Sequence, residues 1–325
     1  MALPAVLKHF GKEPNLVMSN AGIDIGIFDN PDNRISYKAR SKLLAHCAVS
    51  TNCNYLGLMI GQQTGLKSLG LIGLLLKYST DVNTALQSLC RYMHLQVQGS
   101  IIALKSDINS ATLSYRALQT DTEAGDQVGD AVAAIMFNIL NELCGKGWKP
   151  SEICFIRQKP ENIQPYRSFF KSQLSFNNTE TAVVFDAKWL QHRILFCDQE
   201  LQQFLLQQIE QLELQHSQDF LEQVRSVLRA SILTGHAHSN NVAAMFSMHS
   251  RTMSRHLDKL GVSFQGLLDE CRFEVAKQLL QKPHSEVGQI AEIMKFADTS
   301  SFTRSFKRWS GSTPTQWRTT YKTHN

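Results

Sequence analysis

One short pattern occurs twice in the last third of this chain, and it restricts the fold of that region more than any other feature. Residues 242–248 read VAAMFSM, and residues 290–296 read IAEIMKF about 48 positions later. Each copy has an apolar residue, an alanine, an apolar residue three positions on, a turn and another apolar residue. Two helices that cross closely need a small side chain at their contact, and Ala243 and Ala291 supply it. The pattern predicts two helix-turn-helix units.

A second helix is predicted after each turn, with apolar residues four positions apart. They are Met253 and Leu257 in the first unit, and Phe302 and Phe306 in the second. Residues at this spacing share one helix face, so we expect that face to be buried. The opposite face is polar, and the major groove of DNA is wide enough to admit a helix. The alternative to a DNA-binding unit is an ordinary helical bundle with polar outer faces. The second copy of the pattern disfavours this alternative.

The polar faces carry side chains suited to nucleic acid. Arg bonds bidentately to guanine, and Ser or Thr contacts several base edges. The candidates for base contact are Arg251, Ser254, Arg255, Thr299, Ser300, Thr303 and Arg304. Phosphate contact gives affinity without sequence information, and its candidates are Lys259, Lys307, Arg308 and Arg318. Asp298 stands where the N-cap of the second of these helices is expected.

The excess positive charge lies in the same region. Residues 218–325 hold fourteen Lys or Arg against nine Asp or Glu, whereas residues 1–217 hold nineteen of each kind. Basic character confined to one region is typical of a protein with a polyanion partner, although a solvated basic face would have the same composition.

A chain of 325 residues is long enough for about two domains. Helical patterns cover residues 35–49, 82–95 and 126–143, and strand patterns cover residues 100–105, 111–116, 152–157 and 182–185. The first two strands flank a turn at residues 107–109 and predict a hairpin. The predicted organisation is an α+β domain over 1–195, a glutamine-rich helical linker over 196–217 and an all-α domain with two helix-turn-helix units over 218–325. The linker helix joins the domains or pairs with another subunit.

Several classes of protein are disfavoured by what the sequence lacks. No apolar run reaches the roughly 18 residues of a membrane span, and Lys8 and His9 come too early for a secretory signal, so a cytoplasmic location is expected. Seven scattered cysteines without a CxxC pair favour free thiols over disulfides or a zinc site. No phosphate loop, GxSxG or HExxH motif occurs. We expect no enzyme activity, no cofactor and no metal site, and we expect His249 and His256 to make polar contacts.

Residues 290–318 resemble the signature of AraC/XylS-type transcription regulators. The matching residues are Ile290, Ala291, Phe296, Ser300, Phe302, Arg304, Phe306, Lys307, Arg308, Trp309, Gly311, Pro314, Trp317 and Arg318. Residues 248–280 resemble the first half of the same domain, so the resemblance covers about residues 219–322. It implies sequence-specific regulation of transcription by two recognition helices, joined by one long helix, that read successive major-groove segments. The seven candidates for base contact fall on the base-contacting positions of the family.

A less specific resemblance covers about residues 15–195. The order of GLMIG at 57–61, LGLIG at 69–73 and TAVVF at 181–185 resembles the arabinose-binding-type domain of ornithine-utilisation-like regulators in this family. It implies effector sensing and dimerisation, without implying that arabinose is the effector. The expected partners are promoter DNA, RNA polymerase, a small-molecule effector and a second copy of the chain, with no membrane. Activation is the expected outcome, although the sequence does not separate it from repression.

The chain departs from the family at both turns. The family usually has Gly there, because its backbone tolerates φ > 0, whereas this chain has Ser247 and Lys295. His249 also replaces a capping Ser. We therefore expect local strain or a shifted turn.

Two other functions are compatible with such a DNA-binding domain, namely DNA alkyl-transfer repair and non-specific architectural binding. The scattered cysteines disfavour the first, because that chemistry needs a zinc-binding cluster or a reactive acceptor thiol. The Arg, Ser and Thr faces disfavour the second.

The sequence leaves the effector-binding residues unknown. The glycines between residues 57 and 73 favour close helix packing over a phosphate cradle, because their spacing fits no phosphate-binding motif. Tyr92, Phe155, Tyr166 and Phe170 could line an apolar pocket, but we expect them to belong to the core.

Overall fold

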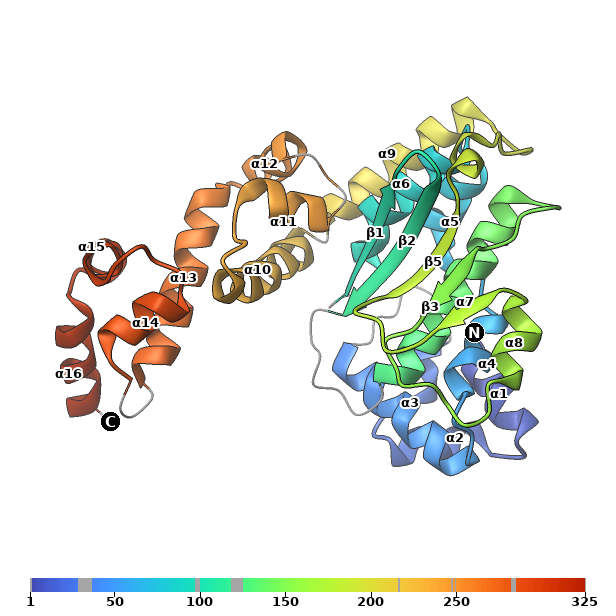
Figure 1. Cartoon of the computed structure of the whole chain (residues 1–325), viewed down its shortest axis with the longest axis horizontal. Helices are drawn as coiled ribbons and strands as arrows, with labels where there is room; N and C mark the ends of the chain where they lie inside the picture. The colour runs from blue at the N-terminus through green and yellow to red at the C-terminus, as the bar shows by residue number, and fades with distance from the viewer. Residues whose placement is uncertain are drawn as a thin grey trace. The chain divides into compact units, whose positions relative to one another are not determined.

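The computed structural model describes residues 2–28, 37–96, 100–117, 125–215, 217–246, 248, 250–281 and 285–324. The chain divides into two compact units, Met1–His216 and Ser217–Asn325 (Figure 1). The first contains a sheet with helices packed around it, and the described part of the second is helical without strands. An α+β domain followed by an all-α domain is therefore the observed fold class, as the patterns predicted. No described helix is both long and apolar enough to cross a bilayer.

The first unit combines a small sheet with α-helices and short 3-10 helices. Its α-helices are α1 (Ala2–His9), α2 (Pro14–Asn20), α3 (Tyr37–Thr51), α4 (Leu56–Gln62), α5 (Gly70–Lys77), α6 (Val82–Tyr92), α7 (Gly125–Cys144), α8 (Gln164–Phe170) and α9 (Gln199–Gln215). Its 3-10 helices are η1 (Ile25–Phe28), η2 (Leu66–Leu69), η3 (Met93–Leu95) and η4 (Ala187–Gln191). Its strands are β1 (Ser100–Ser106), β2 (Ser110–Ala117), β3 (Glu152–Cys154), β4 (Gln173–Ser175) and β5 (Thr181–Asp186).

The five strands form one sheet in the order β1-β2-β5-β3-β4, antiparallel except for the parallel pair β3 and β4. The predicted hairpin is confirmed: Ser106 lies opposite Ala111, and Asp107 Oδ1 accepts from the N–H groups of Asn109 and Ser110 over 2.8 Å each.

The strand predicted over 152–157 ends at Cys154 instead. The chain beyond it bonds to a neighbouring loop, where Phe155 O accepts from Asn178 N–H over 3.0 Å and Arg157 O accepts from Asn177 N–H over 3.0 Å. These bonds replace those of a continued strand.

Close crossing of α4 and α7 explains the glycine-rich segment. A Cβ added at Gly57 would lie 1.9 Å from the carbonyl oxygen of Gln127, and one added at Gly61 would lie 2.4 Å from that of Ala131. Only hydrogen fits at these positions, because two backbones approach each other there. The packing interpretation of these glycines is thus confirmed.

The glutamine-rich stretch forms α9, which packs on α5. Leu205 and Ile209 are buried in the core of the first unit, whereas Phe204 is exposed. The compact unit extends through this helix to His216, so the helix treated as a linker in the sequence interpretation contributes to the first core. Tyr92, Phe155, Tyr166 and Phe170 are also buried in this core, as expected.

The second unit places a helix of 18 residues between two groups of helices, one of which contains a second helix of 18 residues. Its helices are α10 (Ser217–Thr234), α11 (Ser239–Met245), α12 (Ser250–Lys259), α13 (Phe264–Gln281), α14 (Val287–Ile293), α15 (Thr299–Ser310) and α16 (Pro314–His324). Within this unit α13 contacts α10 on one side and α14, α15 and α16 on the other (Figure 1). The pairs α11–α12 and α14–α15 are the two helix-turn-helix units.

Candidate nucleic-acid interface

The two helix-turn-helix units close their turns with the same backbone hydrogen bond. Met248 N–H donates to Ala243 O over 2.9 Å, and Phe296 N–H donates to Ala291 O over 2.9 Å. Both alanines are buried where the paired helices meet, and Met248 is buried behind its turn. The repeated sequence pattern therefore corresponds to a repeated local structure.

Buried apolar residues fix the orientation of α12 and α15. Met253 and Leu257 are the buried residues of α12, and Phe302 and Phe306 are those of α15. The ring of Phe306 lies 5.4 Å from that of Phe273 on α13, measured between centroids. Since one face of each helix is held in the core, the opposite face is directed outward.

Helix α15 has a defined cap at each end. Asp298 Oδ1 accepts from Ser301 N–H over 2.6 Å, and Asp298 Oδ2 accepts from Ser301 Oγ–H over 3.1 Å. These bonds, the backbone one first, lower the pKa of the Asp298 carboxyl. Gly311 ends the helix with φ of 77° and donates to Lys307 O over 2.9 Å. The predicted N-cap is confirmed.

The turn of the second unit has a lysine in a conformation that favours glycine. Lys295 has φ of 59°, as the departure from the family's Gly implied. Its Cγ lies 3.4 Å from where a Cβ on Gly235 would stand, so its stem packs beside the end of α10. Ser247 and His249, the corresponding departures in the first unit, lie outside the described residues.

The base-contact candidates of α12 lie along one side of the helix. Arg251 and Arg255 are exposed, and Ser254 between them is half-buried. Positions separated by three or four residues adjoin on a helix, so the three side chains form one strip. The strip faces away from the buried Met253 and Leu257.

The base-contact candidates on α15 differ in how exposed their side chains are. Thr299, Ser300 and Arg304 are exposed, whereas Thr303 is half-buried. Thr303 Oγ1–H donates to Thr299 O over 2.8 Å, which leaves its methyl group and an acceptor lone pair for a partner. Arg304 Nη2 donates to Ser301 Oγ over 3.3 Å, a contact that a base edge could displace.

The four phosphate-contact candidates have different surroundings. Lys259 and Lys307 are exposed. Arg308 donates from Nη2 to Asp269 Oδ2 on α13 over 2.9 Å, so a carboxylate already neutralises it. Arg318 is half-buried, and its Nε and Nη2 are covered without a hydrogen-bond partner in the described part of the chain. Two of the four cations are thus directly available to a phosphate.

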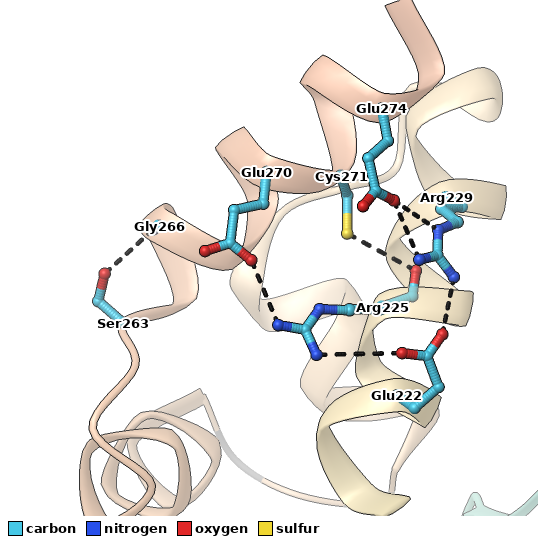
Figure 2. A network of polar contacts seen from close by, with 8 residues as sticks. All are labelled: Glu222, Arg225, Arg229, Ser263, Gly266, Glu270, Cys271 and Glu274. Atoms are coloured by element: carbon cyan, nitrogen blue, oxygen red, sulfur yellow. Dashed lines mark hydrogen bonds and ion pairs between the residues drawn. The ribbon is translucent and has the colours of Figure 1, made fainter. Parts of the chain in front are cut away.

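An ion-pair network joins α10 to α13, and the sequence interpretation did not anticipate it. Figure 2 shows Arg225 and Arg229 of α10 between three carboxylates. Arg229 bonds Glu274 through Nη2 over 3.0 Å and Glu222 through Nη1 over 2.9 Å, and Arg225 bonds Glu270 over 3.3 Å. The matching four-residue spacings on the two helices were the available signal.

The network changes how the basic charge of this unit is distributed. Arg225 and Arg229 are neutralised by carboxylates, so they add little to the field outside the domain. The cations on α12 and α15 that have no ion pair with any described residue are Arg251, Arg255, Lys259, Arg304 and Lys307. Five of the described cations without an ion pair therefore lie on the two outward-facing helices, and the others are Arg272, Lys277, Lys295 and Arg318.

Four of the seven thiols lack the setting of a reactive acceptor. Burial raises the pKa of Cys47 to about 11 and that of Cys144 to about 12, and it does the same to Cys154 and Cys271, each to about 11. A thiol is nucleophilic as its thiolate, so these four are unreactive near neutral pH. This disfavours the alkyl-transfer alternative further.

Comparison with known proteins agrees with both halves of this description. Residues 11–194 match the model for the arabinose-binding domain of AraC transcription regulators, and residues 242–320 match a helix-turn-helix domain. The chain is 24% identical to an ornithine utilization regulator of Pseudomonas aeruginosa over 98% of this chain and 94% of the relative. It is 22% identical to the transcriptional regulator VirS of Mycobacterium tuberculosis over 96% of this chain and 93% of the relative.

Among solved structures, the transcriptional regulator CdpR from Pseudomonas aeruginosa aligns with a TM-score of 0.48 at 18% identity, over 98% of this chain and 96% of that one. The first family match alone covers more than half of the sequence. The chain belongs to the AraC family of DNA-binding transcription regulators, in the branch whose N-terminal half is an arabinose-binding-type domain.

Proposed function

We propose that this regulator reads two successive major-groove segments of promoter DNA with α12 and α15 and that its first unit responds to a small-molecule effector. The observation that carries the reading mode is the matched pair of turns, each closed by one bond of 2.9 Å. Each turn presents an outward helix whose cations, apart from Arg308, lack carboxylate partners among the described residues. A single recognition helix would not need the second turn.

The proposal divides the polar residues by role. Base contact is assigned to Arg251, Ser254 and Arg255 on α12 and to four residues of α15, namely Thr299, Ser300, Thr303 and Arg304. Lys259 and Lys307 are assigned to phosphate, because both are exposed without an ion pair to a described residue. Arg308 and Arg318 reach phosphate only if Arg308 leaves Asp269 and Arg318 leaves its partly buried position.

The remaining parts of the proposal rest on the family. We assign a homodimer to the first unit, RNA polymerase as the protein partner, the cytoplasm as the location and activation as the outcome. The oligomeric state is checked by analytical ultracentrifugation of the full chain at micromolar concentration, and a monomer there would contradict the dimer.

The reading mode is tested with an operator found by genome-wide mapping of bound sites. We expect Arg304→Ala to weaken binding to the operator by about 1–3 kcal/mol and to relax specificity at one base, while binding to a scrambled duplex hardly changes. Lys307→Ala is the matched control, because loss of a phosphate contact weakens both duplexes alike and reduces the salt slope by about 1. Equal loss on both duplexes for Arg304→Ala would refute base reading. A wild-type protein without preference for its operator would instead indicate an architectural binder.

A further inference from the structure

The two outward-facing helices of the second unit are connected to each other through α10 and α13. Helix α12 packs on α11, α11 packs on α10, and α10 packs on α13 (Figure 1). Helix α15 packs on α13 directly, where the ring of Phe306 meets that of Phe273. Residues 260–263 also link α12 to α13, but a connection of four residues fixes one end of α12 and not its angle. The contact between α10 and α13 therefore sets how α12 lies relative to α15.

Apolar packing by itself specifies the position of α10 on α13 only weakly. Both helices bury apolar side chains, among them Val224 and Leu228 on α10 and Leu268 and Val275 on α13. Hydrophobic contact is non-directional, so it distinguishes poorly between arrangements that bury a similar apolar area. Polar pairs at such a contact can select one register between two helices, because any other register leaves a polar group without its partner.

Two ion pairs between α10 and α13 supply this direction. Arg225 Nη2 lies 3.3 Å from Glu270 Oε2, and Arg229 Nη2 lies 3.0 Å from Glu274 Oε2 (Figure 2). The two arginines are four residues apart and so are the two carboxylates, so the pairs are about one helical turn apart on both helices. A slip of one turn, about 5.4 Å, would give one arginine the wrong carboxylate and leave the other without one. Both pairs therefore form at one register only.

Arg229 is held on three of its nitrogens. Its Nε and Nη2 both donate to Glu274 Oε2, over 3.2 and 3.0 Å, and its Nη1 donates to Glu222 Oε1 over 2.9 Å. Because Glu222 belongs to the same helix as Arg229, it orients the guanidinium toward α13. The side chains of Arg225 and Arg229 are 26% and 37% exposed, so solvent screens these pairs less than fully exposed ones. A network of this kind contributes where an isolated surface pair contributes little.

We propose that Arg225 and Arg229 are positioning residues for DNA reading, which act through Glu270 and Glu274 to fix the register of α10 on α13. They touch no DNA in this role, since their guanidinium groups are already engaged by carboxylates. They set the distance and the rotation between α12 and α15, and so the spacing of the two segments that the protein recognises. This inference rests on the proposed reading of two major-groove segments.

The size of a register error shows why such a device matters. A slip of about 5.4 Å between the helices exceeds the rise of about 3.4 Å between successive base pairs. A protein in the slipped register would therefore hold α12 out of phase with the segment that it reads while α15 is correctly seated. Each helix would keep its own contacts in isolation, and only their simultaneous use would be lost.

The test measures binding of the full chain to three duplexes by fluorescence anisotropy. They are the mapped operator, an operator with one segment scrambled, and an operator with one base pair inserted between the segments. The variant is Arg229→Gln/Glu274→Gln, which removes the pair of 3.0 Å and keeps the net charge of the wild type. The matched control is Arg116→Gln/Glu180→Gln, which removes an ion pair of 3.1 Å from the first unit and also keeps the net charge.

We expect the variant to bind the mapped operator about threefold to fivefold more weakly than the wild type, the effect of losing one ion pair of a network. It should bind the scrambled-segment duplex as tightly as the wild type does, because each reading helix keeps its own contacts, and this also shows that the variant folds. The inserted base pair should weaken the variant by a smaller factor than the wild type. The control should match the wild type on all three duplexes.

Two outcomes would overturn the inference. One is full-strength binding of the operator by the variant, and the other is an equal loss on all three duplexes, which indicates less folded protein and not misplaced helices. If the wild type binds the operator no better than the scrambled-segment duplex, the proposed reading of two segments itself fails. If the wild type needs both segments and the variant behaves identically, the reading mode stands and only the positioning role of the network fails.

Discussion

Lys295 allows the strain in the second turn to be measured. Its φ of 59° lies in the left-handed region, where a side chain other than Gly is unfavourable by about 1 kcal/mol. Lys295→Gly removes the strain and the charge together, whereas Lys295→Ala removes the charge and keeps the strain. Both variants lose the Cγ that packs beside Gly235. We therefore expect the Gly variant to be more stable than the Ala variant by about 1 kcal/mol, confined to the second unit.

Hydrogen exchange followed by mass spectrometry resolves this difference in the full chain. Peptides from α14 and α15 should exchange about fivefold more slowly in the Gly variant, because 1 kcal/mol corresponds to about that factor in the opening equilibrium. Peptides from the first unit serve as the internal control and should not change. Equal exchange in the two variants would refute a turn held in the left-handed conformation. Equal affinity of the two variants for random DNA is also expected, because each removes one positive charge.

Three further predictions test the packing and the buried charge. Gly57→Ala should destabilise the first unit by about 3 kcal/mol or more in urea denaturation, because the added methyl would lie 1.9 Å from a backbone oxygen of Gln127; wild-type stability would contradict the helix crossing. Phe306→Ala should destabilise the second unit by about 3–5 kcal/mol and reduce operator binding, and full stability would show that this ring is not in a core. Burial raises the pKa of Asp130 from 3.8 to about 6, so the folded state binds this proton more tightly than the unfolded state. The protonated carboxyl of Asp130 therefore adds to the free energy of unfolding. This contribution is fully present below pH 3.8 and is lost as pH rises to about 6. Urea denaturation at a series of pH values should show the wild type losing free energy of unfolding relative to Asp130→Asn between pH 3.8 and about 6. If the free energies of the two proteins changed with pH in parallel, the raised pKa of Asp130 would be refuted.

Much of the fold was predictable from local pattern. The helix-turn-helix pairs, the hairpin at residues 100–117 and the cap at Asp298 all follow from residues a few positions apart, whereas the left-handed turn at Lys295 was implied by the family resemblance. The strand at 152–157 was predicted too long, because its end depends on bonds to residues 177 and 178, which no periodicity reveals. The glutamine-rich helix was treated as a linker, because an amphipathic pattern shows that a helix buries one face but not against which core.

In the candidate interface, too, some features follow from local sequence and others only from tertiary packing. The sequence by itself determined which side chains line the outward faces of α12 and α15, because helical spacing decides that face. Only the tertiary structure decided which cations stay uncompensated. Arg308 is neutralised by Asp269, 39 positions away, and Arg225 by Glu270, 45 positions away. The buried pair of Asp130 and Arg157 joins residues 27 positions apart. Four-residue spacing shows which charged residues share a helix face, but which element that face packs against is decided only in the tertiary structure.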